Sequence, residues 1–115
     1  MSSSRKVSIG EIWKVSLNDA TGHEQQGERP AVVISVHPQT QLAMVVPFTS
    51  QRWADRFPYT HTVIRSTTNG LASNSVAMIF QLRCLSLRRF ISKMGFVEQK
   101  DFSIIQLTIK NYLRL

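Results

Sequence analysis

The hydrophobic residues of this chain fall mostly into short runs that are bounded by turn-forming residues. Runs rich in valine, isoleucine, threonine and aromatic residues, separated by glycine, proline, asparagine or aspartate, are typical of β-strands. The sequence therefore predicts strands over residues 9–17, 29–36, 42–48, 59–64, 76–82 and 93–97. The consecutive apolar residues of the second run further indicate a strand that is buried on both faces.

The last segment has a helical period instead. From about Glu98 onward, apolar residues recur every three or four positions, at Phe102, Ile105, Ile109 and Tyr112. This stripe predicts a carboxy-terminal helix that packs on the sheet. A second, short helix is expected over 85–91. Together these elements predict a mainly β fold, a small and strongly bent antiparallel sheet with a C-terminal helix.

Pro47 marks the end of the third predicted strand. Proline has no backbone N–H to donate to a neighbouring strand, so we expect pairing to stop close to this residue and the chain to leave the sheet at Thr49. A hydroxyl group is then presented at a strand terminus.

Composition indicates one folded domain over residues 1–115. Hydrophobic residues make up 43% of the chain and charged residues 18%, which excludes disorder as a description of the whole. Fourteen lysines and arginines against seven acidic residues give a net charge of +7, which favours a polyanionic partner, either nucleic acid or an acidic protein. The alternative is that the charge serves solubility alone.

The sequence also disfavours disulfide-bonded, secreted, membrane-bound and metal-dependent proteins. Cys84 is the lone cysteine, so no internal disulfide can form; we expect a buried, inert thiol and a cytoplasmic location. No apolar segment is long enough for a signal peptide or a membrane span, so no membrane partner is expected. The three histidines lack the spacing of metal ligands, and we expect neither a metal nor another cofactor.

Two segments carry groups suited to nucleic acid. Residues 22–28 form a polar loop that leads through Arg29 into the second strand, and the planar arginine fork suits a phosphate. Residues 51–58 mix two arginines, Arg52 and Arg56, with Trp53 and Phe57, a combination that holds unpaired bases and their backbone. Alternatively, Arg29 forms an ion pair with a glutamate, and the aromatic rings fold back onto the sheet.

Successive blocks of the sequence resemble the MazF/PemK family of toxin endoribonucleases. The blocks are Gly10-Glu11-Ile12-Trp13, Gly27-Glu28-Arg29-Pro30-Ala31-Val32-Val33-Ile34, Pro47-Phe48-Thr49-Ser50 and Ser75 to Leu85. The resemblance implies an SH3-like barrel that forms a homodimer. It also implies the toxin of a type II toxin-antitoxin system, a sequence-specific endoribonuclease that cleaves single-stranded RNA without metal and leaves 2′,3′-cyclic phosphate and 5′-hydroxyl ends.

The resemblance also implies the catalytic residues, which are Arg29 and Thr49. RNA brings its own nucleophile, the 2′-hydroxyl, so the protein needs to orient that group, stabilise the phosphorane and move two protons. Arginine suits the stabilising role. The structural alternatives are an ion pair of Arg29 with Glu24 or Glu28, and a turn hydrogen bond at Thr49 and Ser50.

Further residues are candidates for contacts with RNA. Glu24 and His61 are the two candidates for the general base, and Gln81 and Arg83 are expected to share one face of a strand. The family often has an acidic residue where this chain has Phe80, which puts base recognition by that position in doubt. The full set of RNA-binding candidates is Glu24, Gln25, Ser50, Arg52, Trp53, His61, Gln81 and Arg83.

The resemblance implies a partner as well, an acidic and partly disordered antitoxin that covers the basic groove. The alternative function is that of a toxin with the same fold that poisons DNA gyrase without cutting RNA. That group ends in a tryptophan-containing sequence, whereas this chain ends Asn111-Tyr112-Leu113-Arg114-Leu115, which disfavours the alternative. An SH3-like module without catalytic activity would leave Arg29 and Thr49 without a shared purpose.

Overall fold

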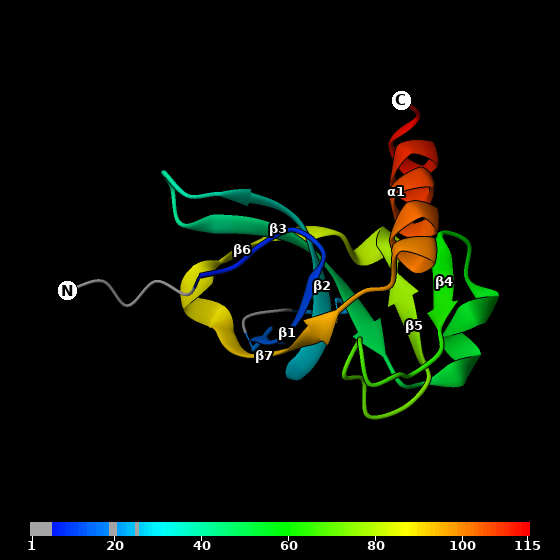
Figure 1. Ribbon diagram of the computed structural model, residues 1–115. Coiled ribbons are helices and arrows are strands. Elements are labelled where there is room, and N and C mark those ends of the chain that lie inside the picture. Colours follow the sequence, from blue (N-terminus) through cyan, green and yellow to red (C-terminus); the bar gives the residue numbers. More distant parts are fainter. Residues whose placement is uncertain (1–5, 19–20, 25) are drawn as a thin grey trace.

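The computed structural model describes residues 6–18, 21–24 and 26–115. Within these residues, seven strands form a bent antiparallel sheet in the order β4-β5-β3-β2-β1-β7, with β6 paired to β3 (Figure 1). Three short 3-10 helices, η1 to η3, connect strands. The elements are β1 Glu11–Ser16, β2 Glu28–His37, β3 Leu42–Thr49, η1 Arg52–Arg56, β4 Thr60–Val63, β5 Ser75–Met78, η2 Ile79–Gln81, β6 Arg83–Ser86, η3 Leu87–Arg89, β7 Phe90–Phe96 and α1 Gln99–Leu113.

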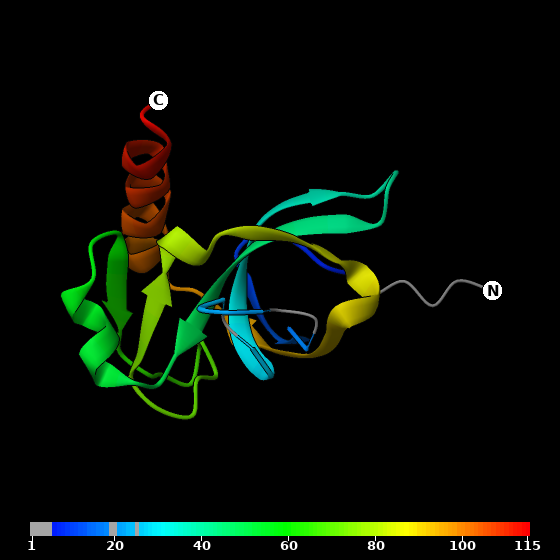
Figure 2. The same ribbon diagram turned by 180° about the vertical axis from the view of Figure 1, so that it is seen from behind.

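β3 is the strand around which the sheet is organised. Its residues from Leu42 to Pro47 pair with β2, while Phe48 and Thr49 pair with β5 on the other side. Pairing with β2 therefore stops at Pro47, as expected, and the strand continues to Thr49 through its pairing with β5 on the opposite edge. The turn at 37–40, which joins β2 to β3, projects beyond the other strands (Figure 2), while Leu42 to Val45 of β3 pair with β6.

The segment between the fifth strand and the last strand differs from the prediction. The strand expected over 76–82 ends at Met78, and the helix expected over 85–91 is wrong, since that stretch contains the end of β6, one 3-10 turn and the start of β7. Leu87 and Phe90 are both buried. Their spacing of three residues imitates a helix, but a strand corner produces it equally well. Ser86 stabilises this corner by accepting a hydrogen bond from the backbone N–H of Arg88 at 3.2 Å.

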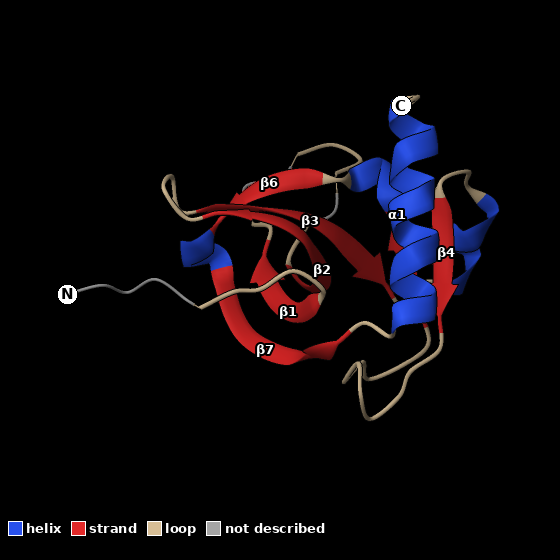
Figure 3. Ribbon diagram, turned by 45° about the horizontal axis from the view of Figure 1, so that its top comes forward, coloured by secondary structure: helices blue, strands red, loops and turns tan. Residues whose placement is uncertain are grey.

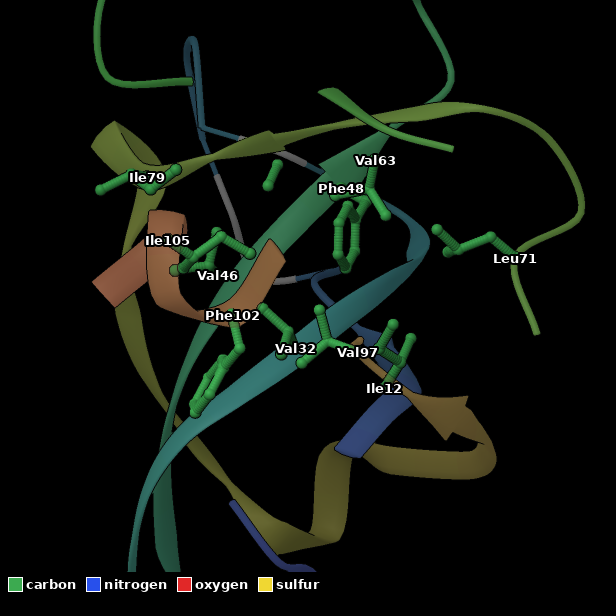
Figure 4. Close-up of a cluster of buried hydrophobic side chains, with 11 residues drawn as sticks. Ile12, Val32, Val46, Phe48, Val63, Leu71, Ile79, Val97, Phe102 and Ile105 are labelled. Carbon is green, nitrogen blue, oxygen red and sulfur yellow. The ribbon is translucent and has the colours of Figure 1, made fainter. Parts of the chain in front are cut away.

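The carboxy-terminal helix α1 packs as its stripe predicted. It lies beside β4 (Figure 3), and Phe102 and Ile105 are buried in a core that includes Val32 and Val46 of the sheet (Figure 4). Tyr112 is 38% exposed and packs against the ring of Tyr59, with 4.8 Å between the ring centroids. Within the described part of the chain, no helix is long and apolar enough to span a membrane.

Cys84 is exposed, contrary to the expectation of a buried thiol. It lies on β6 next to Leu85, which is 2% exposed. Because successive side chains of a strand point to opposite faces, burial of Leu85 directs Cys84 outward.

A buried carboxylate ties β1 to β7. Glu11 is 6% exposed and accepts hydrogen bonds from the indole of Trp13 and the backbone N–H of Ser8, each at 2.9 Å, while Lys93 lies 2.9 Å from its other oxygen. Burial alone would raise the pKa of the Glu11 carboxyl, but these donors together outweigh it and hold the pKa below its usual value. The charged form is thus favoured by the fold.

We expect Glu11→Gln to lower the free energy of unfolding by about 1–3 kcal/mol at pH 7, since buried donors lose a charged acceptor. A carboxyl with a depressed pKa in the folded state stabilises the protein above the pKa of the unfolded chain, and that stability is lost as the pH falls through the folded pKa. The difference between wild type and variant should therefore shrink towards pH 3. Denaturant unfolding at both pH values measures it.

Glu28→Gln is the matched control, because Glu28 is exposed and lies 4.0 Å from Lys14 at the surface. Its effect should stay within about 0.5 kcal/mol. A Glu11→Gln effect of equal size at pH 7 and pH 3 would contradict this account of Glu11.

Candidate active site

The pairing of β2 with β3 brings Arg29 and Thr49 together. The recorded partners are Ala31 with Pro47 and Val32 with Val46. The same register, extended by two residues, places Arg29 opposite Thr49. Arg29 is also held from its other side, where it pairs with Val15 of β1. Two residues twenty positions apart in the sequence are thus neighbours because of strand register.

Arg29 and Thr49 each line two adjoining cavities. The smaller cavity, of about 230 Å³, has Glu28, Ser50, Ser73 and Ser75 among its polar lining residues. The larger one, of about 760 Å³, is mainly apolar, and we call it the aromatic cavity; it is lined by His23, Arg29, Thr49, Gln51, Trp53, Ala54, Phe57, Met78, Phe80 and Gln81. The two residues therefore stand where the cavities meet, accessible from both.

The guanidinium of Arg29 is oriented by the backbone. Its Nε donates a hydrogen bond to the carbonyl of Gln26 at 2.9 Å. Within residues 6–18, 21–24 and 26–115, neither glutamate that was considered as its ion-pair partner takes that role. Glu24 accepts from the backbone N–H of Thr21 at 2.6 Å, and Glu28 faces Lys14. The fork of Arg29 is fixed through one nitrogen, and its terminal nitrogens are left for an anion.

Thr49 is 4% exposed, and its Oγ1 accepts a hydrogen bond from the backbone N–H of Gln51 at 3.2 Å. The turn hydrogen bond considered as an alternative is therefore present. It occupies an acceptor site of the hydroxyl, so the hydroxyl hydrogen can still be donated. Ser50, which follows, lines the smaller cavity.

Three aromatic rings border the larger cavity. Trp53 and Phe57 come from η1 and the residue after it, and they are 53% and 43% exposed. Phe57 lies between the other two rings, 5.9 Å from Trp53 and 5.9 Å from Phe80 between centroids. Trp53 and Phe57 are thus largely exposed, whereas Phe80 is half-buried and packs against Val76 and Met78 of β5. Arg52 is exposed on η1 but lines neither cavity.

Gln81 and Arg83 do not share a face of one strand, because η2 ends at Gln81 and β6 begins at Arg83. Gln81 lines the aromatic cavity and donates a hydrogen bond from Nε2 to the carbonyl of His23 at 3.0 Å. Arg83 pairs with Val45 of β3 and lines neither cavity. Of the two, the structure brings only Gln81 to the cleft.

The two candidates for the general base lie elsewhere. His61, on β4, has its Nε2 2.8 Å from Oδ1 of Asp101, a residue of α1 that is 7% exposed. This contact joins the strand to the helix, and His61 lines neither cavity. Glu24 also lines neither cavity, and Gln25 lies outside the described residues.

The comparison with known families decides the classification. Residues 8–113 match the family of PemK-like, MazF-like toxins of type II toxin-antitoxin systems. The chain belongs to this family. It is 32% identical over 114 residues to Endoribonuclease MazF9 of Mycobacterium tuberculosis, in a match that covers 92% of this chain and 95% of that protein.

Solved structures of MazF proteins share the fold. The crystal structure of MazF from Deinococcus radiodurans has a TM-score of 0.81 at 22% identity, covering 95% of this chain and 97% of that one. A chain from the MazE-MazF crystal structure of the same organism has a TM-score of 0.70 at 20% identity, covering 93% and 94%. The predicted fold class, mainly antiparallel β with a carboxy-terminal helix, is thus confirmed for this MazF-like toxin.

Sequence reasoning missed several residues of the toxin's cleft. His23, Gln51, Met78 and Phe80 line the aromatic cavity but were not among the candidates. Phe80 could have been found, since it directly precedes Gln81. His23 gave no signal, because its place depends on a loop contact to Gln81, fifty-eight residues away. Across the described residues, no group of three or more His, Cys, Asp or Glu side chains could hold a metal ion.

Proposed function

We propose that this toxin cleaves single-stranded RNA at specific sequences, without metal, through attack of the substrate's own 2′-hydroxyl on the adjacent phosphorus. The protein is an endoribonuclease, like its relative MazF9. The observation that supports this chemistry is that Arg29 and Thr49, two residues beyond the last recorded β2–β3 pair, both line the two adjoining cavities. A single phosphodiester at that point contacts both side chains.

Arg29 is the electrostatic group of this mechanism. As the 2′-oxygen attacks, negative charge builds on the non-bridging oxygens of the phosphorane, and a planar fork with parallel donors can hold two of them. The hydrogen bond from Nε to Gln26 orients the guanidinium before the substrate arrives. Little reorganisation is then needed when the charge develops. Because arginine remains protonated near neutral pH, it acts as a clamp and as a donor, not as the base.

Thr49 supplies a hydroxyl on the other side of the same phosphate. Its oxygen is fixed by the N–H of Gln51, and its hydrogen donates to a non-bridging phosphate oxygen while the 2′-oxygen bonds to phosphorus and the bond from phosphorus to the 5′-oxygen breaks. Ser50 adds a second hydroxyl in the smaller cavity. Trp53 and Gln81 border the aromatic cavity, and Arg52 lies on the same turn as Trp53. These residues form the proposed RNA contacts.

Single-stranded RNA is the substrate that this chemistry favours. In-line attack by the 2′-oxygen requires a backbone distortion that an A-form duplex resists, and base edges are accessible only when the bases are unpaired. The net charge of +7 speeds the encounter with any polyanion. The same charge suits an acidic antitoxin, and we include such a partner in the proposal, together with a homodimeric toxin. The MazE-MazF structure from Deinococcus radiodurans provides a related complex.

The test is to map the ends of fragments from a long, unstructured RNA that is incubated with the purified protein and EDTA. We expect cleavage at a recurring short sequence, with 2′,3′-cyclic phosphate on one fragment and 5′-hydroxyl on the other, because the nucleophile is internal and no metal takes part. Fragments with 3′-hydroxyl and 5′-phosphate ends, or cleavage that requires an added divalent metal, would contradict the proposal.

A further inference from the structure

We infer that the aromatic cavity is a base-binding subsite, in which Phe57 and Phe80 hold one unpaired base of the nucleotide next to the cleaved phosphate. The inference rests on the proposed function and names the residues that select the substrate. It assigns Phe80, which lines this cavity, a role in stacking.

The cavity has the form that a stacked base requires. Phe57 packs edge-to-face against Trp53 on one side and Phe80 on the other, with interplanar angles of 74° and 63°. Each edge-to-face contact covers one face of one ring, but Trp53 remains 53% exposed and Phe57 43% exposed, so apolar ring surface is left for a flat ligand. Beneath them, Ala54, Val76 and Met78 form a small buried cluster against which Phe80 packs. The rings are therefore a fixed platform, presented from η1 and η2.

The position of the cavity identifies the base that enters it. Arg29 and Thr49 are part of its lining, so a base in the cavity belongs to a nucleotide that adjoins the phosphate they hold. At the same time, Arg52 and Arg56 lie on η1, which carries Trp53. The same short helix carries Asp55, so two arginines face one carboxylate, and a phosphate backbone that leaves the cavity in this direction meets a net positive charge. Aromatic faces flanked by arginines are the usual means of binding single-stranded nucleic acid.

The polar rim favours a nucleobase over an apolar side chain of a protein partner. The indole N–H of Trp53 can only donate, so the 3.2 Å contact with Gln51 uses the amide oxygen of Gln51 and leaves its NH₂ group. A carbonyl can only accept, so the 3.0 Å contact of Gln81 with His23 uses the NH₂ group of Gln81 and leaves its oxygen. One donor and one acceptor at the rim match the edge of a base.

The test measures the affinity of wild type and variants for a short RNA that contains the mapped cut, made uncleavable by 2′-deoxyribose at the cut. Each nucleotide is replaced in turn by an abasic ribose. At one position beside the cut, loss of the base should raise the wild-type Kd about 10- to 100-fold. Phe80→Ala should raise the Kd for the intact RNA by a similar factor and leave the Kd for that abasic RNA unchanged.

Phe57→Ala should likewise raise the Kd for the intact RNA and leave the Kd for that abasic RNA unchanged. Because the Phe57 side chain is already 43% exposed, its loss should disturb the fold little. Phe96→Ala is the matched control, because Phe96 is 49% exposed on β7, packs against Lys93 and lines neither cavity. It should bind every RNA as wild type does. Thermal unfolding establishes that each variant is folded.

If the loss of affinity caused by Phe57→Ala or Phe80→Ala multiplied with the loss caused by the abasic ribose at every RNA position, no single base would depend on these rings. That result would overturn the subsite. Unchanged RNA affinity in Phe57→Ala and Phe80→Ala, with weakened binding of the antitoxin, would assign the cavity to the antitoxin and overturn it as well. Because the readout is binding, it is independent of the cleavage chemistry. If the protein cuts RNA as proposed but the phenylalanine variants lose the same affinity for abasic and intact RNA, only the subsite is refuted and the proposed function stands.

Discussion

RNA with a single 2′-deoxyribose at the cut position will not be cleaved at that bond. In the proposed mechanism the nucleophile is the 2′-oxygen of the nucleotide on the 5′ side of the bond, and the protein supplies no substitute. Its removal therefore abolishes the reaction instead of slowing it. The measurement compares two short RNAs that differ by this one oxygen, followed to the limit of detection at high enzyme concentration.

The control RNA carries the deoxyribose one nucleotide further from the cut, where only contacts are lost. It should be cleaved within a few-fold of the unmodified rate. Cleavage at the deoxyribose position would mean that water or a protein group attacks the phosphorus, and the mechanism would be wrong.

Arg29→Ala should lower kcat/KM by about 100-fold or more. Loss of one preorganised donor to a developing oxyanion costs on the order of a hundredfold, and this substitution removes the whole fork together with its charge. Arg29→Lys should restore only part of the rate, because an ammonium group keeps the charge but cannot donate two parallel hydrogen bonds. Single-turnover cleavage of a short RNA measures both variants.

Arg65→Ala is the matched control, since Arg65 is exposed, lies next to α1 and lines neither of the two cavities. It lowers the net charge by the same amount as Arg29→Ala and therefore has the same effect on encounter. We expect less than a threefold change. Equal losses in the two variants would reduce Arg29 to a contributor of general positive charge. Both changes affect surface groups, so unfolding temperatures should stay close to wild type.

The parts of the fold that depend on strong local patterns were predictable. β2 and α1 were found because a continuous apolar run and a helical stripe each have one simple structural solution. The region from Ile79 to Arg89 was not predictable, because the two short 3-10 helices η2 and η3 interrupt the strands there. No glycine or proline in the sequence indicates these interruptions. Apolar residues three positions apart then imitated a helix.

The site was predictable to the extent that it follows from strands and motifs. Arg29 and Thr49 were named from the sequence, and their neighbourhood follows from the β2–β3 register. The position of His61 was not predictable, since its contact with Asp101 joins residues forty positions apart. The wall of the aromatic cavity likewise forms where η1 and η2 lie side by side, and no periodicity in either segment predicts that contact.

The most direct test of the central claim, that Arg29 and Thr49 act on one phosphate, is the single-turnover cleavage rate of Arg29→Ala, Thr49→Val and the double variant. Thr49→Val removes the hydroxyl and keeps the shape of the side chain. Groups that stabilise one transition state together give non-additive losses, so the double variant should be little slower than the slower single variant. Losses that multiply, or a full rate in either single variant, would contradict the account.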